Sequence, residues 1–163
     1  TTALGHGTQV SVYLPRLDDP ALAGDDLPTA PAAANGAETV LLVEDEDVVR
    51  GAARRILRDS GYKVIEAFDG VEALRLTERH RGPIHLLVTD VVMPRMNGPQ
   101  LVERLGMLRP DVKVLYISGY TDEADVARGV ADDDAAFLQK PFTQEALTTK
   151  VRSLLDATTA GVA

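Results

Sequence analysis

Short runs of branched apolar residues recur along most of this chain, and the stretches between them carry apolar residues at helical spacing. A continuous run of four or more such residues is typical of a strand that is buried on both faces, as in a parallel sheet. We therefore expect five strands, at residues 40–43, 62–68, 84–89, 112–117 and 135–138.

The stretches between these runs predict amphipathic helices, because their apolar residues return every three or four positions. Strand and helix alternate between residues 39 and 156. This alternation predicts the α/β class, namely a doubly wound five-stranded parallel sheet with helices on both faces. The expected helices lie near residues 48–57, 71–79, 101–108, 124–130 and 147–155.

Composition changes sharply ahead of the folded region. Residues 18–38 are rich in alanine, proline and acidic residues and hold almost no large apolar side chains, so they predict a flexible linker. Residues 1–17 contain a strand-like alternation from Thr8 to Leu14, and they are either the end of another domain or a leader. The predicted organisation is therefore 1–17, a linker at 18–38, a folded domain at 39–156 and a tail at 157–163.

Bulk properties exclude several classes of function. The chain carries a formal net charge of -8 and contains no cysteine. A nucleic-acid surface needs clustered Lys and Arg, and disulfide or thiolate chemistry needs Cys, so neither is expected. No apolar run approaches the roughly 20 residues that a membrane span requires. We expect a cytoplasmic fragment of a longer protein, without nucleic-acid or membrane contacts of its own.

Polar side chains follow four of the five expected strands at the point where each strand ends. In a doubly wound sheet these ends lie along one edge, where ligands bind. The residues expected at this edge are Glu44, Asp45, Asp90, Ser118 and Lys140. Crowded carboxylates repel one another unless a cation joins them, and oxygen ligands without His or Cys favour Mg²⁺. A lysine and a serine would add a positive charge and a hydroxyl donor around a phosphoryl group.

Each of these residues also has an ordinary structural interpretation. An acidic cluster after a strand often caps the next helix, and Asp47 is a candidate for that N-cap. Asp90 and Ser118 alone fit turns, and Lys140 alone fits a solvated surface. Their joint order at four strand ends favours a single site, in which Asp90 is a nucleophile that accepts a phosphoryl group.

Residues 39–156 resemble a two-component receiver domain. The motifs that carry the resemblance are Val43-Glu44-Asp45, Asp90-Val91-Val92-Met93-Pro94-Arg95-Met96-Asn97-Gly98, Ile117-Ser118-Gly119 and Phe137-Leu138-Gln139-Lys140-Pro141-Phe142. The resemblance implies a flavodoxin-like strand order of 2-1-3-4-5. It also implies transfer of a phosphoryl group from phosphohistidine onto Asp90.

The same resemblance implies a role for each residue at the strand ends. The implied Mg²⁺ ligands are Glu44, Asp45, Asp90 and the backbone carbonyl of Val92. Lys140 would pair with the phosphoryl group, Ser118 would be the switch hydroxyl and Phe137 the switch aromatic. Phe137 stands where tyrosine is common in the family, so its switch would work through ring packing rather than through a phenolic hydrogen bond.

We expect a phosphoacceptor receiver that switches the face formed by helix 4 (expected near 124–130), strand 5 (135–138) and helix 5 (147–155). As an enzyme it would catalyse only its own phosphorylation and dephosphorylation. Two alternatives stay open, a degenerate receiver that acts as a protein-docking module and a magnesium-dependent aspartyl-phosphate phosphatase. The phosphatase is disfavoured because its second aspartate would fall at Val92.

The N-terminal residues resemble a second family. Gly5-His6-Gly7-Thr8 and the following strand-like residues are similar to the last glycine box and final strand of a histidine-kinase ATPase domain. This order of segments implies the C-terminal part of a hybrid histidine kinase, and a free-standing response regulator with an unrelated leader is the alternative. The implied partners are the phosphohistidine helix of a histidine kinase or a histidine phosphotransfer protein, and a homodimer is left open.

Overall fold

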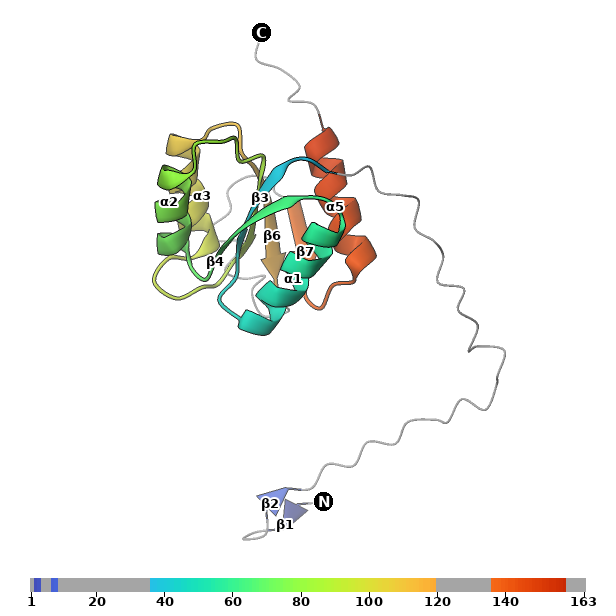
Figure 1. Cartoon of the computed structure of the whole chain (residues 1–163). Helices are drawn as coiled ribbons and strands as arrows, with labels where there is room; N and C mark the ends of the chain where they lie inside the picture. The colour runs from blue at the N-terminus through green and yellow to red at the C-terminus, as the bar shows by residue number, and fades with distance from the viewer. Residues whose placement is uncertain (1, 4–6, 9–35, 120–135, 158–163) are drawn as a thin grey trace, which may run out of the picture.

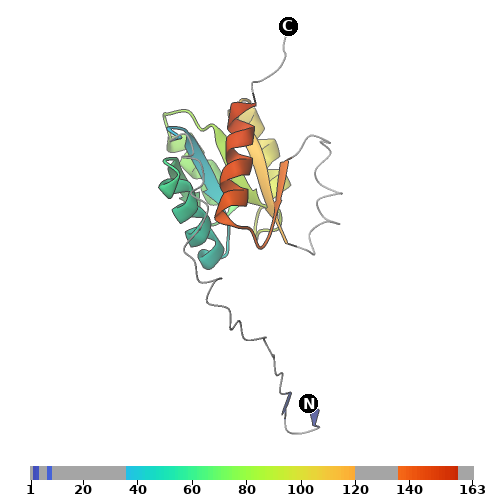
Figure 2. The same cartoon turned by 90° about the vertical axis from the view of Figure 1, so that its right-hand side faces the viewer.

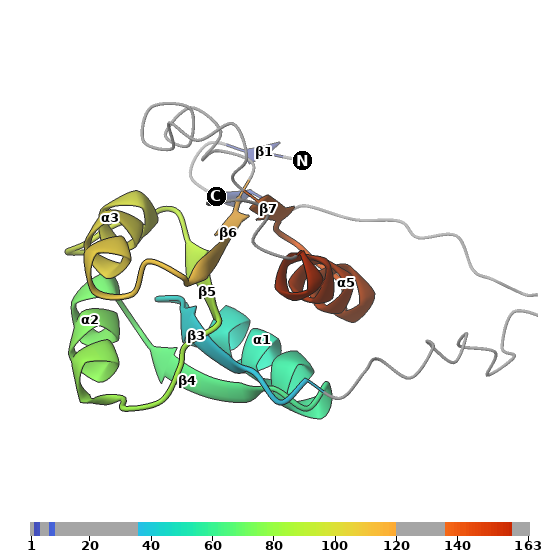
Figure 3. The same ribbon diagram turned by 90° about the horizontal axis from the view of Figure 1, so that it is seen from above.

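The structure, a computed structural model, describes residues 2–3, 7–8, 36–119 and 136–157. The strands of its central sheet are β3 (Thr39–Val43), β4 (Lys63–Ala67), β5 (Leu86–Asp90), β6 (Lys113–Ser118) and β7 (Ala136–Gln139). Figure 1 shows the whole chain from the side. The order of these strands is β4-β3-β5-β6-β7, as the view from above shows (Figure 3), and every neighbouring pair is parallel. The predicted α/β class and the predicted order 2-1-3-4-5 are therefore confirmed.

Helices cover both faces of this sheet. Those in the described part of the chain are α1 (Asp47–Asp59), α2 (Gly70–Arg79), α3 (Gly98–Leu108) and α5 (Gln144–Asp156). Seen from above, α1 and α5 lie on one face and α2 and α3 on the other (Figure 3). The helix expected at residues 124–130 lies outside the described residues. None of the helices described here is both long enough and apolar enough to cross a membrane.

A short two-stranded pairing lies near the N-terminus. β1 (Thr2–Ala3) pairs antiparallel with β2 (Gly7–Thr8). The strand expected from Thr8 to Leu14 lies outside the described residues, apart from Thr8 itself. The kinase-like origin of residues 1–17 therefore stays a prediction.

The central strands divide their side chains between two apolar cores. Every residue of β3 and β5 is buried, because each of these strands has a neighbour on both sides and helices over both faces. Val40 and Leu42 join the core beneath α1 and α5, whereas Leu41 and Val43 join the core beneath α2 and α3. Complete burial of each such side chain contributes roughly 1.5–3 kcal/mol, which holds the strand ends rigidly in place.

Side-chain caps begin most of the described helices. The caps of α2, α3 and α5 are Asp69, Asn97 and Thr143. Helix α1 differs, because its N-cap residue Glu46 makes no side-chain cap hydrogen bond. The prediction of Asp47 as the N-cap is wrong. Asp47 is the first residue of the helix, and its carboxylate pairs with Arg50 instead.

The described residues just ahead of β3 pack against the domain. The Gly36 N–H donates to the Ser60 carbonyl at 3.3 Å, and a Cβ on Gly36 would lie 2.1 Å from the ring of Tyr62. Glu38 then pairs with Arg152 of α5 at 3.0 Å. These contacts fix the entry of the chain beside α5, which packs next to α1 (Figure 2).

Gly98 begins α3 where that helix approaches the end of β5. A Cβ on Gly98 would lie 2.3 Å from the Asp90 carbonyl oxygen. We expect Gly98→Ala to lower the free energy of unfolding by roughly 2 kcal/mol, as overpacking against a rigid backbone does. Gly106→Ala in the same helix is the matched control, because nothing lies within 4 Å of a Cβ there and alanine should stabilise the helix by roughly 0.5–1 kcal/mol. Urea unfolding measures both changes, and equal effects would contradict the steric argument.

Candidate functional site at the carboxyl edge of the sheet

The carboxyl ends of four strands bring the expected polar residues to one edge of the sheet. Glu44 directly follows β3, and Asp90 is the last residue of β5. Ser118 ends β6, and Lys140 directly follows β7. The last two are also joined through the backbone, because the Lys140 N–H donates to the Ser118 carbonyl at 2.8 Å. The site therefore inherits its geometry from the buried sheet.

Three carboxylates converge at this edge. One oxygen from each of Glu44, Asp45 and Asp90 lies within 4.8 Å of the others. Glu44 is 1% exposed and Asp90 is 6% exposed, whereas Asp45 faces solvent. Mg²⁺ prefers oxygen ligands, binds through few carboxylates and keeps several of its waters. This set of donors, buried on one side and open on the other, fits that ion.

Lys140 contacts two of the three carboxylates. Its Nζ lies 2.5 Å from Asp90 Oδ2 and 2.7 Å from Glu44 Oε2. Burial opposes the charged form of Lys140, but hydrogen bonding and charge interactions with Asp90 and Glu44 outweigh burial and raise the pKa of the ammonium group. Lys140 therefore stays protonated at neutral pH and holds a positive charge beside Asp90.

The carboxylate of Glu44 is incompletely compensated. Burial, together with the charge of Asp90, raises the pKa of Glu44 above its ordinary 4.5 despite the nearby Lys140. Its buried Oε2 lies 2.7 Å from the Lys140 ammonium group, but that single positive charge is shared with Asp90. Two buried carboxylates with one cation between them cost free energy that a second cation would offset. Glu44 therefore also fits a ligand of Mg²⁺.

The loop between β5 and α3 orients the side chain of Asp90. The Val92 N–H donates to Asp90 Oδ1 at 3.2 Å, while Lys140 holds Oδ2. The Thr89 hydroxyl donates to the Asp90 carbonyl at 3.0 Å, and Gly98 packs against that same carbonyl. Asp90 is thus fixed through both its carboxylate oxygens and its backbone.

The expected switch residues lie on the neighbouring strands β6 and β7. Ser118 is buried at the end of β6. The ring of Phe137 stacks on Tyr116, its register partner, with centroids 5.3 Å apart and 19° between the ring planes. A stacked aromatic pair adds roughly 0.5–1.5 kcal/mol beyond the burial of its area, so this pair helps to hold β7 against β6.

Arg50, which no sequence motif singled out, ties α1 to the end of β3. Arg50 donates to the Glu44 carbonyl at 2.7 Å and pairs with Asp47. The spacing of Asp47 and Arg50 by three residues is a sequence signal for an ion pair on one helix face. Nothing in the sequence indicates that the guanidinium also reaches a strand-end carbonyl, because that contact depends on the packing angle of the helix.

The raised pKa of Glu44 leads us to expect a gain in stability when its charge is removed. The folded pKa of Glu44 lies above the unfolded value of 4.5. Between these two pH values the folded state therefore keeps a proton that the unfolded state has released. The contribution of Glu44 to stability is therefore fully present below 4.5 and is lost as pH rises through the folded pKa. We expect Glu44→Gln to raise the melting temperature by a few degrees at pH 7 without Mg²⁺, and this gain should vanish below pH 4.5.

With Mg²⁺ present, the parent should become more stable than Glu44→Gln. Loss of a residue that merely orients a metal ligand weakens binding roughly tenfold or more, and loss of a ligand oxygen should weaken Mg²⁺ binding at least as much. The metal should therefore stabilise the parent more than the variant. Thermal unfolding with and without Mg²⁺ measures both effects. Glu103→Gln removes an exposed carboxylate from α3 and is the control. A Glu44→Gln variant that is less stable than the parent in metal-free buffer at pH 7 would contradict this account of the carboxylate.

Comparisons with known proteins agree with this geometry. Residues 40–152 match the family model described as the response regulator receiver domain. The sensor kinase CckA of Brucella abortus (strain 2308) is 42% identical over 164 residues, which cover 94% of this chain and 17% of the kinase. The response regulator receiver protein CpdR of the same organism is 35% identical over 119 residues, which cover 72% of this chain and 97% of CpdR.

A solved structure extends the likeness to three dimensions. The crystal structure of the receiver domain from the hybrid histidine kinase CckA has a TM-score of 0.61 and 39% sequence identity, and the match covers 72% of this chain and 98% of that domain. The predicted receiver resemblance is therefore confirmed, and the likeness to CckA and CpdR is consistent with phosphoacceptor function in a two-component phosphorelay. The chain belongs to the response regulator receiver family.

Proposed function

We propose that this domain takes a phosphoryl group from a phosphohistidine onto Asp90 and that Mg²⁺ is required for the transfer. The observation that carries the proposal is the position of the Asp90 carboxylate. It lies 2.5 Å from the ammonium group of Lys140, it accepts the Val92 N–H, and its oxygens converge with those of Glu44 and Asp45. The residues proposed as nucleophile, countercharge and metal ligands thus lie together at one edge of the sheet.

In the proposed reaction, an oxygen of Asp90 attacks phosphorus and the P–N bond of the phosphohistidine breaks. The product is an acyl phosphate on Asp90, and the imidazole leaves with the bonding electron pair and takes a proton from solvent. Mg²⁺, held by Glu44, Asp45, Asp90 and the Val92 carbonyl, would neutralise charge on the phosphoryl oxygens. Lys140 would transfer its ion pair from the carboxylate to a phosphoryl oxygen.

Ser118 and Phe137 would transmit the phosphorylation of Asp90 to the surface of the domain. Attraction of the Ser118 hydroxyl to a phosphoryl oxygen would move the end of β6, and the Phe137–Tyr116 stack lies in the same two strands. The affected face includes β7 and α5, together with the expected helix 4, which lies outside the described residues. The outcome is a population shift of that face between two states.

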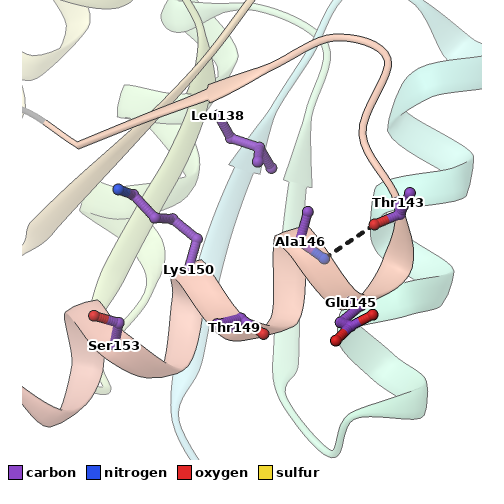
Figure 4. A pocket seen from close by; sticks show the side chains of 7 residues that line it. All are labelled: Leu138, Thr143, Glu145, Ala146, Thr149, Lys150 and Ser153. Carbon is purple, nitrogen blue, oxygen red and sulfur yellow. Dashed lines mark hydrogen bonds between the residues drawn. The ribbon is translucent and has the colours of Figure 1, made fainter. Parts of the chain in front are cut away.

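The same face supplies a surface for a partner. A hollow of about 460 Å³ lies along α5 next to β7 (Figure 4). Its lining combines apolar and polar side chains, namely Leu138, Thr143, Glu145, Ala146, Thr149, Lys150 and Ser153. We include this hollow in the face that a downstream protein or a second copy of the domain would read.

The parent protein is proposed to be a hybrid histidine kinase of the cytoplasm. The likeness to the sensor kinase CckA supports this, because it extends over 94% of the chain and so reaches beyond the receiver domain. The chain spans only 17% of that kinase, so the kinase activity and the partners belong to the proposal. The phosphodonor would be the parent's own phosphohistidine helix or a histidine phosphotransfer protein.

Incubation of the chain with acetyl phosphate tests the function directly. In the presence of Mg²⁺, intact-mass spectrometry should show one added phosphoryl group, and chelation of the metal by EDTA should abolish the addition. A domain that bound no Mg²⁺ and took up no phosphoryl group would be a docking module instead. Steady release of phosphate from added phosphoesters, with turnover, would indicate the phosphatase.

A further inference from the structure

Arg95 has an unusual backbone conformation for an arginine. It lies in the loop from 91 to 97 that joins β5 to α3, and its φ is 68°. A residue with a Cβ in this left-handed region costs roughly 1–2 kcal/mol. The contacts of the Arg95 side chain must therefore offset a conformation that glycine or asparagine would adopt more easily.

The Arg95 side chain reaches a different loop. Its guanidinium forms an ion pair with Asp69 and lies over the Phe68 ring, 5.1 Å from the ring centroid. Asp69 is 1% exposed and also caps α2 by accepting the Glu72 N–H at 2.7 Å. Arg95 thus ties the loop after Asp90 to the turn between β4 and α2.

The next residue adds a second attachment to the same turn. Met96 is buried, and a Cβ on Gly70 would lie 2.8 Å from its Cγ and Sδ atoms. Any larger residue at position 70 would require the Met96 side chain to shift. Two successive residues of the loop, Arg95 and Met96, are therefore fixed against the start of α2, at its N-cap Asp69 and its first residue Gly70.

Arg95 and Met96 lie only a few residues after Val92, the residue of the loop that contacts the site. The Val92 N–H donates to Asp90 Oδ1, and the Val92 carbonyl is the backbone ligand that the proposed function assigns to Mg²⁺. Between them lies a tight turn in which the Met96 N–H donates to the Pro94 carbonyl at 2.8 Å. The side chain of Val92 is 49% exposed, but Val91 and Met93 on either side of it are buried, and the Val91 N–H donates to the Ile117 carbonyl at 3.2 Å. Val92 therefore lies between two anchored segments, one held by the sheet and the other by Arg95 and Met96.

We propose that Arg95 is a positioning residue that holds the loop after Asp90 in the conformation that Mg²⁺ binding requires, acting through Asp69 and Phe68. This contact of Arg95 with Asp69 and Phe68 is separate from the carboxylates and Lys140 at the site. The inference rests on the proposed function, because Val92 matters only as part of the phosphoacceptor site. An arginine suits the task, since its planar guanidinium can pair with a carboxylate and stack on a ring together, which a lysine does less well.

Arg95→Asn tests the tether, because asparagine tolerates the left-handed conformation but lacks the charge and the reach. Amide hydrogen exchange of Val92 and Met96 in metal-free protein should accelerate about tenfold, while the amides of β5 keep their rates. The dissociation constant for Mg²⁺, measured by NMR titration, should rise about tenfold, as expected for loss of an outer partner of a metal ligand. Arg104→Gln, which removes an exposed positive charge from α3, should change neither.

Asp69→Asn provides the matched variant on the other side of the contact. It keeps an oxygen that can cap α2 and removes the charge that Arg95 meets, so it should reproduce the effects of Arg95→Asn. In the double variant, the loop exchange rates and the Mg²⁺ dissociation constant should change no more than in either single variant. The double variant also serves as the test if Arg95→Asn alone fails to fold because Asp69 is left buried without a partner. Unchanged loop exchange and unchanged Mg²⁺ affinity in Arg95→Asn would overturn the inference. A parent domain that bound no Mg²⁺ would instead overturn the proposed function, and the exchange rates in metal-free protein would still decide whether the tether exists.

Discussion

Replacement of Asp90 by asparagine is expected to abolish labelling of the domain by acetyl phosphate and Mg²⁺. An amide oxygen is not a nucleophile at neutral pH, so no acyl phosphate can form. The fold should persist, because asparagine can still accept the Val92 N–H. Intact-mass spectrometry after a fixed incubation measures the change, and circular dichroism checks that the variant is folded.

Asp111→Asn is the matched control for this loss, since Asp111 is an exposed carboxylate just before β6. It should be labelled like the parent. If Asp90→Asn retained full labelling at a mapped site, another residue would be the acceptor and the assignment of Asp90 would be wrong. If neither protein were labelled, the docking-module alternative would take its place.

Lys140→Met should separate metal binding from phosphoryl transfer. Removal of the ammonium group leaves Glu44 and Asp90 without the cation that lies 2.7 Å and 2.5 Å from them. We expect a loss of roughly 2 kcal/mol in the metal-free domain, less than the 3–5 kcal/mol seen for fully buried pairs, because the Lys140 side chain is 20% exposed. Mg²⁺ should bind more tightly than in the parent, since no fixed ammonium group competes for the carboxylates, yet labelling should be slower.

Lys63→Met is the control for loss of a lysine away from the site, because Lys63 is exposed at the start of β4. Thermal unfolding across a Mg²⁺ titration and the initial rate of labelling give the two readouts. Weaker Mg²⁺ binding in Lys140→Met, together with slower labelling, would mean that Lys140 organises the whole site rather than opposing the metal. Equal labelling rates would remove Lys140 from the proposed mechanism.

The parts of the fold that the sequence predicts are those governed by local pattern. The runs that contain Leu41 and Val88 become β3 and β5, fully buried strands, because branched apolar residues without polar interruption fit only a strand covered on both faces. The polar residues at the strand ends were predictable for a related reason. A charged residue such as Asp90 directly after a buried run is favourable only where the sheet meets solvent or a ligand.

Contacts between loops were not predictable in this way. Asp69 and Arg95 are far apart in the sequence and belong to segments with a turn-like composition, so only the three-dimensional packing brings them together. The stack of Phe137 on Tyr116 needs the register of β6 against β7, and no sequence pattern states that register. The N-cap of α1 lies one residue before Asp47, a difference that a run of four acidic residues hides and that is usual at the ends of helices.

The docking of Gly36 and Glu38 onto Tyr62 and Arg152 has a consequence for protein engineering. A receiver transplanted into another signalling protein should be cut ahead of Gly36 rather than at the first strand. A cut at Thr39 would discard the partner of Arg152 and uncover the ring of Tyr62. The short segment before β3 is therefore part of the transferable module, and spacers of altered length belong upstream of it.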